Sequence, residues 1–397
     1  MKEPQIIAET VHAQDTSSLK VAMACPGVGL VQRGFERMFR DLFDLLKQDL
    51  DVRLFKGGGP SSAQETKLLF ISRNGWFLRW FPIHKLVGRT TQHVECFTFA
   101  ISLLIAIWGK GYDVVHCTDP PLARILYKLR KLFGLKFRLL YTEACAMRPS
   151  DCPPADHMHQ ISKVTFDEAV EFGIPPSYMT VIPLGLYPEN FSVEASKKEL
   201  REKYGLAEST FVVLSLAAIN RYHKRTDYLV DEFSAIEGDV LLWIDGSLDQ
   251  GDPDLIQYTK DKLGDRCRVT LLPTCQVGEL FKVADLMVHT SLFEAFGLAM
   301  IEGASTALPV LTHNAKHFLW LLDNKDSAID MSHTGNLSEK LNELKVDRQK
   351  LIPMVNDEQV RDRYTWSVLK NDYLNAYSRL AALPEDDIGI ADRFGLK

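Results

Sequence analysis

Short apolar runs alternate with amphipathic stretches along most of the chain. The apolar run VAMACPG at 21–27 ends in glycine, and a new β-type run, DVRLFK, begins at 51. Between them, residues 33–48 repeat apolar side chains every three to four positions, which is the spacing of one helix face, at Phe35, Met38, Phe39, Leu42, Leu45 and Leu46. This strand, helix and strand predict one unit of a parallel sheet.

The same alternation continues to about residue 185 and then starts again. Further strands of the first half are predicted at 113–119, 137–143 and 180–185, with helices ending near 132 and at 165–172. In the second half, strands are predicted at 211–218, 239–246, 268–273, 286–291 and 308–313, separated by helices at 226–236, 253–263, 277–284 and from about 297. The pattern therefore predicts an α/β protein with two doubly wound, Rossmann-like domains, whose ligands would lie beyond the carboxyl ends of the strands.

The domain boundary is expected in the segment PLGLYPENFSVEASKKEL, which is rich first in proline and glycine and then in polar residues. We place the hinge near 184–192, with an N-terminal domain at 1–187 and a C-terminal domain at 188–369. A chain of 397 residues is long enough for two cores of ordinary size.

Composition narrows the possible functions. With 46% hydrophobic and 25% charged residues the chain is globular, and its net charge of -6 argues against a general nucleic-acid binder. Its seven cysteines contain no Cys-x-x-Cys pair, and the first twenty residues lack an apolar signal core, so a cytoplasmic protein with reduced thiols is expected. The longest apolar run, 97–108, is too short to span a membrane and fits a buried helix.

The loop CPGVGLVQRGFE follows the first predicted strand and leads into the first predicted helix. Its glycines, Gly27, Gly29 and Gly34, would let backbone N–H groups approach an anion at the helix N-terminus. The spacing is not G-x-G-x-x-G, and no acidic residue ends the second strand, so a nicotinamide dinucleotide site is disfavoured. A tight turn without a ligand is the alternative.

A basic loop, NRYHKRTD at 220–227, follows the first strand of the second half. Arg221, His223, Lys224 and Arg225 provide enough cationic donors to bind a diphosphate. A solvated basic turn explains the same residues equally well.

Two carboxylates flank a later strand-to-helix turn. Glu294 precedes the helix that starts near Gly297, and Glu302 lies about one and a half turns inside it. The N–H groups of Phe296, Gly297 and Leu298 would be the unpaired donors of that helix start. The arrangement suits a long ligand with hydroxyls at two places and phosphate between them, whereas the structural alternative is a loop Glu and a helix-stabilising Glu.

Taken in order, these segments resemble the retaining glycosyltransferases of family 4, which have the GT-B fold. SLFEAFGLAMIEGAS followed by LPVLTH is similar to the family's donor-site signature. The resemblance covers most of the chain and includes a glycine-rich loop with Gly34 and Glu36, DVVHCTDP, IPLGLYPENF, HKRTDYLVDEF and RYTWSVL. It implies two facing Rossmann-like domains, with a C-terminal segment, about 370–397, that returns to the N-terminal domain.

The resemblance also implies roles for individual residues. Those assigned to the phosphates and the sugar are Lys224 with Arg221 or Arg225 on the diphosphate, Glu294 and the amides of Phe296, Gly297 and Leu298 at the sugar, His116 on the donor sugar, and the Gly29 to Gly34 loop over phosphate and acceptor. Glu302 would bind the ribose hydroxyls, and the segment from Leu272 to Cys275, with Thr274, would receive the base.

The expected activity is a retaining, metal-independent transfer of a sugar from a nucleoside-diphosphate sugar to an acceptor hydroxyl. A UDP-sugar is expected ahead of a GDP- or ADP-sugar, with no further cofactor, and the acceptor could be a glycan, a lipid or a small molecule. The alternatives are another GT-B enzyme, such as a sugar-nucleotide epimerase or a glycoside phosphorylase, and a non-catalytic module that binds a nucleotide sugar or a membrane surface.

Some segments depart from the family or carry weaker signals. Thr118 stands where a second histidine is common, Ala295 replaces a glycine, and HNAKHFLWLL replaces a Gly-Gly-x-x-Glu motif. The cysteine and histidine spacings match no zinc site, and no metal is expected. Residues 67–89 mix aromatic and basic side chains; a core helix with a charged rim is the preferred interpretation, and peripheral contact with the inner membrane face is the other.

Overall fold

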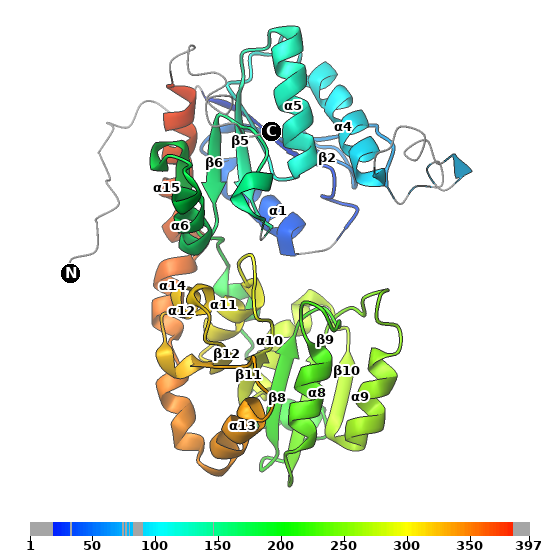
Figure 1. The fold of residues 1–397 in the computed structure, drawn as a ribbon, viewed down its shortest axis with the longest axis vertical. Helices are drawn as coiled ribbons and strands as arrows, with labels where there is room; N and C mark the ends of the chain where they lie inside the picture. Colours follow the sequence, from blue (N-terminus) through cyan, green and yellow to red (C-terminus); the bar gives the residue numbers. More distant parts are fainter. Residues whose placement is uncertain are drawn as a thin grey trace, which may run out of the picture. The chain divides into compact units, whose positions relative to one another are not determined.

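The computed structural model describes residues 19–31, 34–73, 75, 78, 80–81, 90–145 and 147–383. The fold divides into two compact units (Figure 1). Unit 1 combines the chain up to Pro183 with the segment from Leu369 onward, and unit 2 is Leu184–Val368.

Unit 1 contains a parallel sheet of seven strands in the order β3-β2-β1-β4-β5-β6-β7. Its strands are β1 (Lys20–Cys25), β2 (Asp51–Lys56), β3 (Glu65–Lys67), β4 (Val114–Cys117), β5 (Arg138–Glu143), β6 (His157–Gln160) and β7 (Met179–Val181). Its helices are α1 (Gly34–Leu46), α4 (Thr91–Ile107), α5 (Pro120–Phe133), α6 (Lys163–Phe172) and most of α15 (Trp366–Ala381). The strand order reverses between β1 and β4, which is where ligands bind in such sheets.

The two faces of this sheet are covered by different helices. Ala22, Ala24 and Val115 pack with the apolar residues of α4, α5 and α6. On the other face the ring of Phe39, from α1, meets the ring of His116 at a centroid distance of 5.0 Å. Most of helix α15 also belongs to unit 1, and the ring of its Tyr373 meets the ring of His159, from β6, at a centroid distance of 5.2 Å. Continuous apolar strands are what a sheet buried on both faces requires.

Unit 2 contains a parallel sheet of six strands in the order β10-β9-β8-β11-β12-β13. The strands are β8 (Phe211–Leu216), β9 (Val240–Asp245), β10 (Cys267–Thr270), β11 (Leu286–His289), β12 (Val310–His313) and β13 (Ala328–Ile329). The helices are α7 (Lys197–Lys203), α8 (Thr226–Ser234), α9 (Leu255–Leu263), α10 (Val277–Val283), α11 (Leu298–Ala304), α12 (Lys316–Leu322), α13 (Asn336–Val346) and α14 (Asp357–Tyr364). Here the strand order reverses between β8 and β11.

Both ends of unit 2 meet at the Leu186 backbone. Its N–H donates to the carbonyl of Tyr364 at 2.8 Å, and its carbonyl accepts from the N–H of Trp366 at 3.1 Å. A Cβ on Gly185 would collide with the buried ring of Trp366, so a glycine is required for this close approach. The predicted proline- and glycine-rich hinge therefore lies against the tryptophan segment near the end of the chain.

The predicted fold class is confirmed, because both halves form parallel sheets flanked by helices. One local prediction was only half right. The apolar run at 97–108 does form a helix, α4, but Phe97, Ile105 and Trp108 are half or more exposed, while only the opposite side is buried.

Candidate active site

The loop after β8 is shaped by Asn220, a buried residue that was not singled out from the sequence. Its side-chain oxygen accepts the N–H groups of His223 at 3.0 Å and Lys224 at 2.8 Å. The carbonyl of Lys224 accepts the Thr290 hydroxyl at 2.6 Å. Arg225 then has a left-handed conformation, with φ of 50°, immediately before α8. The hydrogen bonds at both its N–H and its carbonyl hold the Lys224 backbone in one place.

Lys224 and Glu294 meet directly, although they lie 70 residues apart. The Lys224 ammonium bonds the Glu294 carboxylate, and His289 Nε2 lies 2.8 Å from the same oxygen. The Glu294 side chain is 8% exposed and that of Lys224 17%. Lys224 follows β8 and Glu294 follows β11, so the pair stands where the strand order of unit 2 reverses. Sequence reasoning assigned the two residues to neighbouring parts of one ligand but did not predict their ion pair, and it missed His289.

The surroundings of Glu294 keep it ionised. Burial alone would raise the pKa of Glu294, but the hydrogen bond from His289 and the charge of Lys224 outweigh burial and hold it well below its usual range. The third neighbour, His223, has its Nε2 3.4 Å from the carboxylate. Burial lowers the pKa of His223, and the attraction of Glu294 only partly opposes this. The site is therefore an anion held between one lysine and two histidines.

The two arginines proposed for the diphosphate are both engaged within unit 2. Arg221 bonds Asp252 at 2.9 Å and Asp254 at 2.7 Å. The guanidinium of Arg225 stacks on the Tyr228 ring at 4.0 Å and donates to the Met331 carbonyl at 2.8 Å. Either arginine would have to exchange these partners to bind a phosphate, whereas Lys224 would exchange only one.

The predicted helix start after Glu294 is present at α11. Gly297 has a φ of 103°, and a Cβ there would collide with Met300, so this turn depends on glycine. The Phe296 ring is buried against Trp320 and Tyr364.

The turn before α11 is also fixed by His317, a residue of α12. His317 Nε2 lies 2.7 Å from the Phe296 carbonyl, on the segment where the sequence departs from the family motif. The N–H groups of Phe296, Gly297 and Leu298 donate to no other group in the described part of the chain. Their binding of an anion stays a prediction.

The residues assigned to the nucleoside lie on other loops of unit 2. Glu302, in α11, is 7% exposed. Thr274 is exposed and begins a short 3-10 turn. The segment that precedes it is fixed by buried Asp245, whose carboxylate accepts the Thr270 hydroxyl at 2.6 Å and the Leu272 N–H at 2.9 Å.

In unit 1 the predicted glycine loop packs against a second glycine loop. Gly29 has a φ of 81°, and a Cβ there would collide with the backbone of Gly58. The Gly58 N–H donates to the Val28 carbonyl at 3.0 Å. Gly34 begins α1, as expected. Gly29 is thus required by contact between the two loops, and the GGG run at 57–59 was not recognised as the partner from the sequence.

His116 does not have the environment expected of a sugar-binding residue. It is fully buried in β4, with Nδ1 2.6 Å from the Tyr377 hydroxyl and Nε2 2.6 Å from the Thr142 hydroxyl. Burial, together with the neighbouring His159, lowers the pKa of His116 well below its usual value. Since both ring nitrogens are occupied, His116 has no atom left to contact a sugar, and we do not retain it in the site.

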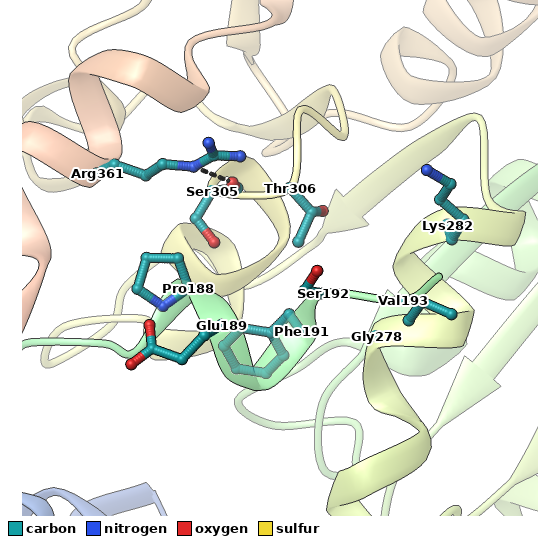
Figure 2. A pocket seen from close by; sticks show the side chains of 10 residues that line it. All are labelled: Pro188, Glu189, Phe191, Ser192, Val193, Gly278, Lys282, Ser305, Thr306 and Arg361. Carbon is teal, nitrogen blue, oxygen red and sulfur yellow. Dashed lines mark hydrogen bonds between the residues drawn. The ribbon is translucent and has the colours of Figure 1, made fainter. Parts of the chain in front are cut away.

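A cavity of about 390 Å³ lies elsewhere in unit 2 and contains none of the predicted site residues (Figure 2). It is lined by the hinge turn that includes Phe191, by Gly278 and Lys282 of α10, and by Ser305 after α11. Arg361 donates to the Ser305 carbonyl at 2.7 Å, as the dashed line in Figure 2 marks. No residue of the loops after β8 and β11 lines this cavity, so it is separate from the site that those loops form.

Within the described ranges, no helix is both long and apolar enough to cross a membrane. Much of the aromatic and basic segment 67–89 lies outside those ranges, so its contact with a membrane stays a prediction.

Comparison with known proteins finds a family match within unit 2. Residues 196–357 match the family described as Glycosyl transferases group 1. Lipopolysaccharide glucosyltransferase WaaG of Escherichia coli is 27% identical over 145 residues, which are 34% of this chain and 38% of WaaG. The chain thus aligns with well under half the length of that relative.

Solved structures match nearly the whole chain. Sucrose-phosphate synthase from Thermosynechococcus elongatus has a TM-score of 0.73 at 16% identity, covering 92% of this chain and 99% of its own. Anabaena Alr3699/HepE in complex with UDP and glucose has a TM-score of 0.68 at 15% identity, covering 91% and 100%. At these identities the match establishes the fold.

Proposed function

We propose, from the premise that this chain belongs with the GT-B glycosyltransferases, that it transfers a sugar from a UDP-sugar to an acceptor hydroxyl. We propose further that the transfer retains the configuration at the sugar's anomeric carbon and needs no metal ion. Structural neighbours described as complexes with UDP and with UDP-glucose support the choice of donor. The acceptor is proposed only as a hydroxyl compound.

The observation that carries the proposal is the cluster of Lys224, Glu294 and His289 where the strand order of unit 2 reverses. The backbone of Lys224 is fixed by hydrogen bonds to Asn220 and Thr290, and its ammonium is paired with a single carboxylate. Its side chain can therefore turn to a phosphate with little rearrangement. Once Lys224 binds the diphosphate, Glu294 is free to accept hydrogen bonds from sugar hydroxyls. The ion pair would thus separate into the two contacts that a sugar diphosphate needs.

The reaction breaks the bond between the anomeric carbon and the β-phosphate oxygen and forms a bond from that carbon to the acceptor oxygen. The acceptor proton passes to the departing phosphate, so the products are the glycoside and UDP. Lys224 and the amides of Phe296, Gly297 and Leu298 would stabilise the negative charge that grows on the leaving group. Neither carboxylate attacks the sugar.

The nucleoside is proposed to lie beside α11 and the loop after β10. Glu302 would accept hydrogen bonds from the ribose hydroxyls, and the backbone around Thr274 would bind the base. Asp245 supports the binding of the base by this loop, since its carboxylate accepts hydrogen bonds from Thr270 and Leu272 and so fixes the segment 270–272.

Release of UDP from UDP-sugars, measured with a panel of acceptors, tests the proposal. We expect Lys224→Ala to lower kcat by about 10²- to 10³-fold, the usual effect of removing a group that stabilises developing charge. Glu302→Gln should mainly raise KM for the donor. Lys282→Ala is the matched lysine control, because Lys282 lies at the separate cavity.

Two further measurements test the mechanism. Activity should survive EDTA, and proton NMR of the first product formed should show the donor's anomeric configuration. Full activity in Lys224→Ala would refute the site assignment. Phosphate-dependent cleavage of a glycoside, or epimerisation of the UDP-sugar without an acceptor, would replace glycosyl transfer with another GT-B reaction.

A further inference from the structure

Two exposed aromatic rings meet beside the Lys224 and Glu294 pair. Unit 2 is described without gaps, and among its aromatic side chains Tyr222, at 85%, and Phe293, at 47%, stand out as exposed large hydrophobics. Their ring centroids lie 6.3 Å apart with the ring planes at 69°. Tyr222 is two residues before Lys224, and Phe293 directly precedes Glu294. The exposed aromatic surface of unit 2 is therefore concentrated at the candidate active site.

The aromatic pair is held in place by His223. The His223 ring stacks on Phe293 with a centroid distance of 5.0 Å and an angle of 25°. Its Nε2 lies 3.1 Å from the Phe293 carbonyl, and its backbone N–H is held by Asn220 at 3.0 Å. We call Tyr222, His223 and Phe293 the aromatic platform. Because His223 also approaches Glu294, the platform is linked to the site through direct contacts.

We propose that the aromatic platform binds the ring of a sugar by stacking, as a subsite next to Glu294. This inference rests on the proposed function and adds a specificity-determining surface to it. A pyranose ring has a face of C–H groups that packs on an aromatic ring and an edge of hydroxyls that needs acceptors. The platform supplies the aromatic surface, and the adjoining Glu294 carboxylate supplies the acceptor.

The position of the platform separates it from the nucleoside. The proposed base contact, Thr274, follows β10. The proposed ribose contact, Glu302, lies within α11. The platform instead comes from the loops after β8 and β11, the same loops that carry Lys224 and Glu294. A ring on the platform is therefore on the sugar side of the diphosphate.

Two sugars could occupy this subsite, and their chemistry is the same. One is the sugar of the donor, and the other is a sugar ring of the acceptor. If the donor sugar occupies the platform, binding of a UDP-sugar depends on the platform and binding of UDP alone does not. An acceptor sugar would leave both nucleotides unaffected and make binding of a glycoside depend on the platform.

Calorimetric titration of the full chain distinguishes the two. The ligands are UDP, a set of UDP-glucose, UDP-galactose and UDP-N-acetylglucosamine, and the p-nitrophenyl glucosides and galactosides titrated with UDP present. The variants are Tyr222→Ala and Phe293→Ala, with Tyr222→Phe as the conservative replacement. Val346→Ala, at a residue 82% exposed on α13, is the matched surface control.

We expect Tyr222→Ala to weaken one class of sugar ligand by about tenfold, the scale of an aromatic stacking contact. Binding of UDP alone should stay unchanged, and Tyr222→Phe should bind like the wild type. Loss of UDP-sugar affinity identifies the donor sugar, and loss of glycoside affinity identifies the acceptor sugar.

Two results would overturn the subsite. One is unchanged affinity of Tyr222→Ala and Phe293→Ala for every ligand, and the other is an equal loss for UDP and UDP-sugars, which would place the nucleoside on the platform. A wild-type protein that binds no UDP would instead refute the proposed donor, and the glycoside titration alone would then decide the subsite.

Discussion

A chain of four buried hydrogen bonds in unit 1 requires two neutral histidines. The Tyr377 hydroxyl pairs with His116 Nδ1, His116 Nε2 with Thr142, Thr142 with His159 Nδ1 at 2.8 Å, and His159 Nε2 with the Ile182 carbonyl at 2.7 Å. Every atom is satisfied when each histidine carries its proton on Nε2. A further proton on either ring would place a donor where an acceptor is needed, so acid should weaken this network.

The size of the effect follows from His159. Burial lowers the pKa of His159 from 6.5 to about 4, although the Ile182 carbonyl partly opposes the shift. The folded state therefore binds fewer protons than the unfolded state, and stability present above pH 6.5 is lost as the pH falls toward 4. Linkage gives a loss of about 2 kcal/mol in the free energy of unfolding between pH 7.5 and pH 5. His159→Gln removes this pH-dependent loss.

The assay compares the wild type with His159→Gln, because other groups titrate in the same range. Burial raises the pKa of Glu143 to about 7 and that of Asp119 to about 6, which opposes the histidine but cancels in the difference. Urea unfolding is followed by pulsed hydrogen exchange of peptides from β5 and β6. His159→Gln should be less stable at pH 7.5, and the gap should shrink by about 2 kcal/mol at pH 5. A gap that stays constant would refute the neutral network.

Three further substitutions test separate parts of the fold and the site. Gly29→Ala should lower the free energy of unfolding by about 1–3 kcal/mol, because it adds both a backbone clash and strain at positive φ, and urea unfolding measures it. Asn220→Ala should lower kcat by about tenfold with little change in donor KM, because the Lys224 loop loses its two bonds; unchanged kcat in the UDP-release assay would contradict this. Asp156→Ala should cost about 3–5 kcal/mol in thermal unfolding, since it leaves buried Arg130 unpaired.

The fold was predictable because the order of strands and helices follows from the local pattern of apolar and polar residues. Alternation of apolar runs with helical periodicity specified two parallel sheets, and the glycine at 297 marked the turn before α11. The loops that bring Lys224 and Glu294 together follow from the same rule, since residues at the carboxyl ends of adjacent strands share one edge. The parallel topology alone therefore predicts that Lys224 and Glu294 lie close together, although it does not predict their contact.

The rest of the site depends on contacts that no local pattern records. His317 bonds the Phe296 carbonyl from 21 residues away. His289 lies inside the strand predicted at 286–291, and nothing in that pattern indicates its contact with Glu294. His116 failed as a predicted ligand for the same reason, because its partner Tyr377 lies 261 residues further along the chain. Histidines serve equally as ligands and as buried donors, and only tertiary packing decides between these roles.

The contact between Lys224 and Glu294 changes how variants of either residue must be interpreted. Removing Glu294 would delete a proposed sugar contact, but it would also release Lys224 and leave His289 without its acceptor. Removing Lys224 would likewise leave a buried carboxylate with only histidine partners, so a loss of activity in either single variant mixes binding with reorganisation. A double-mutant cycle separates these effects, because the coupling energy of the pair should be large without donor and smaller with UDP bound. If the coupling were the same in both states, Lys224 would remain on Glu294 throughout and could not be the group that binds the diphosphate.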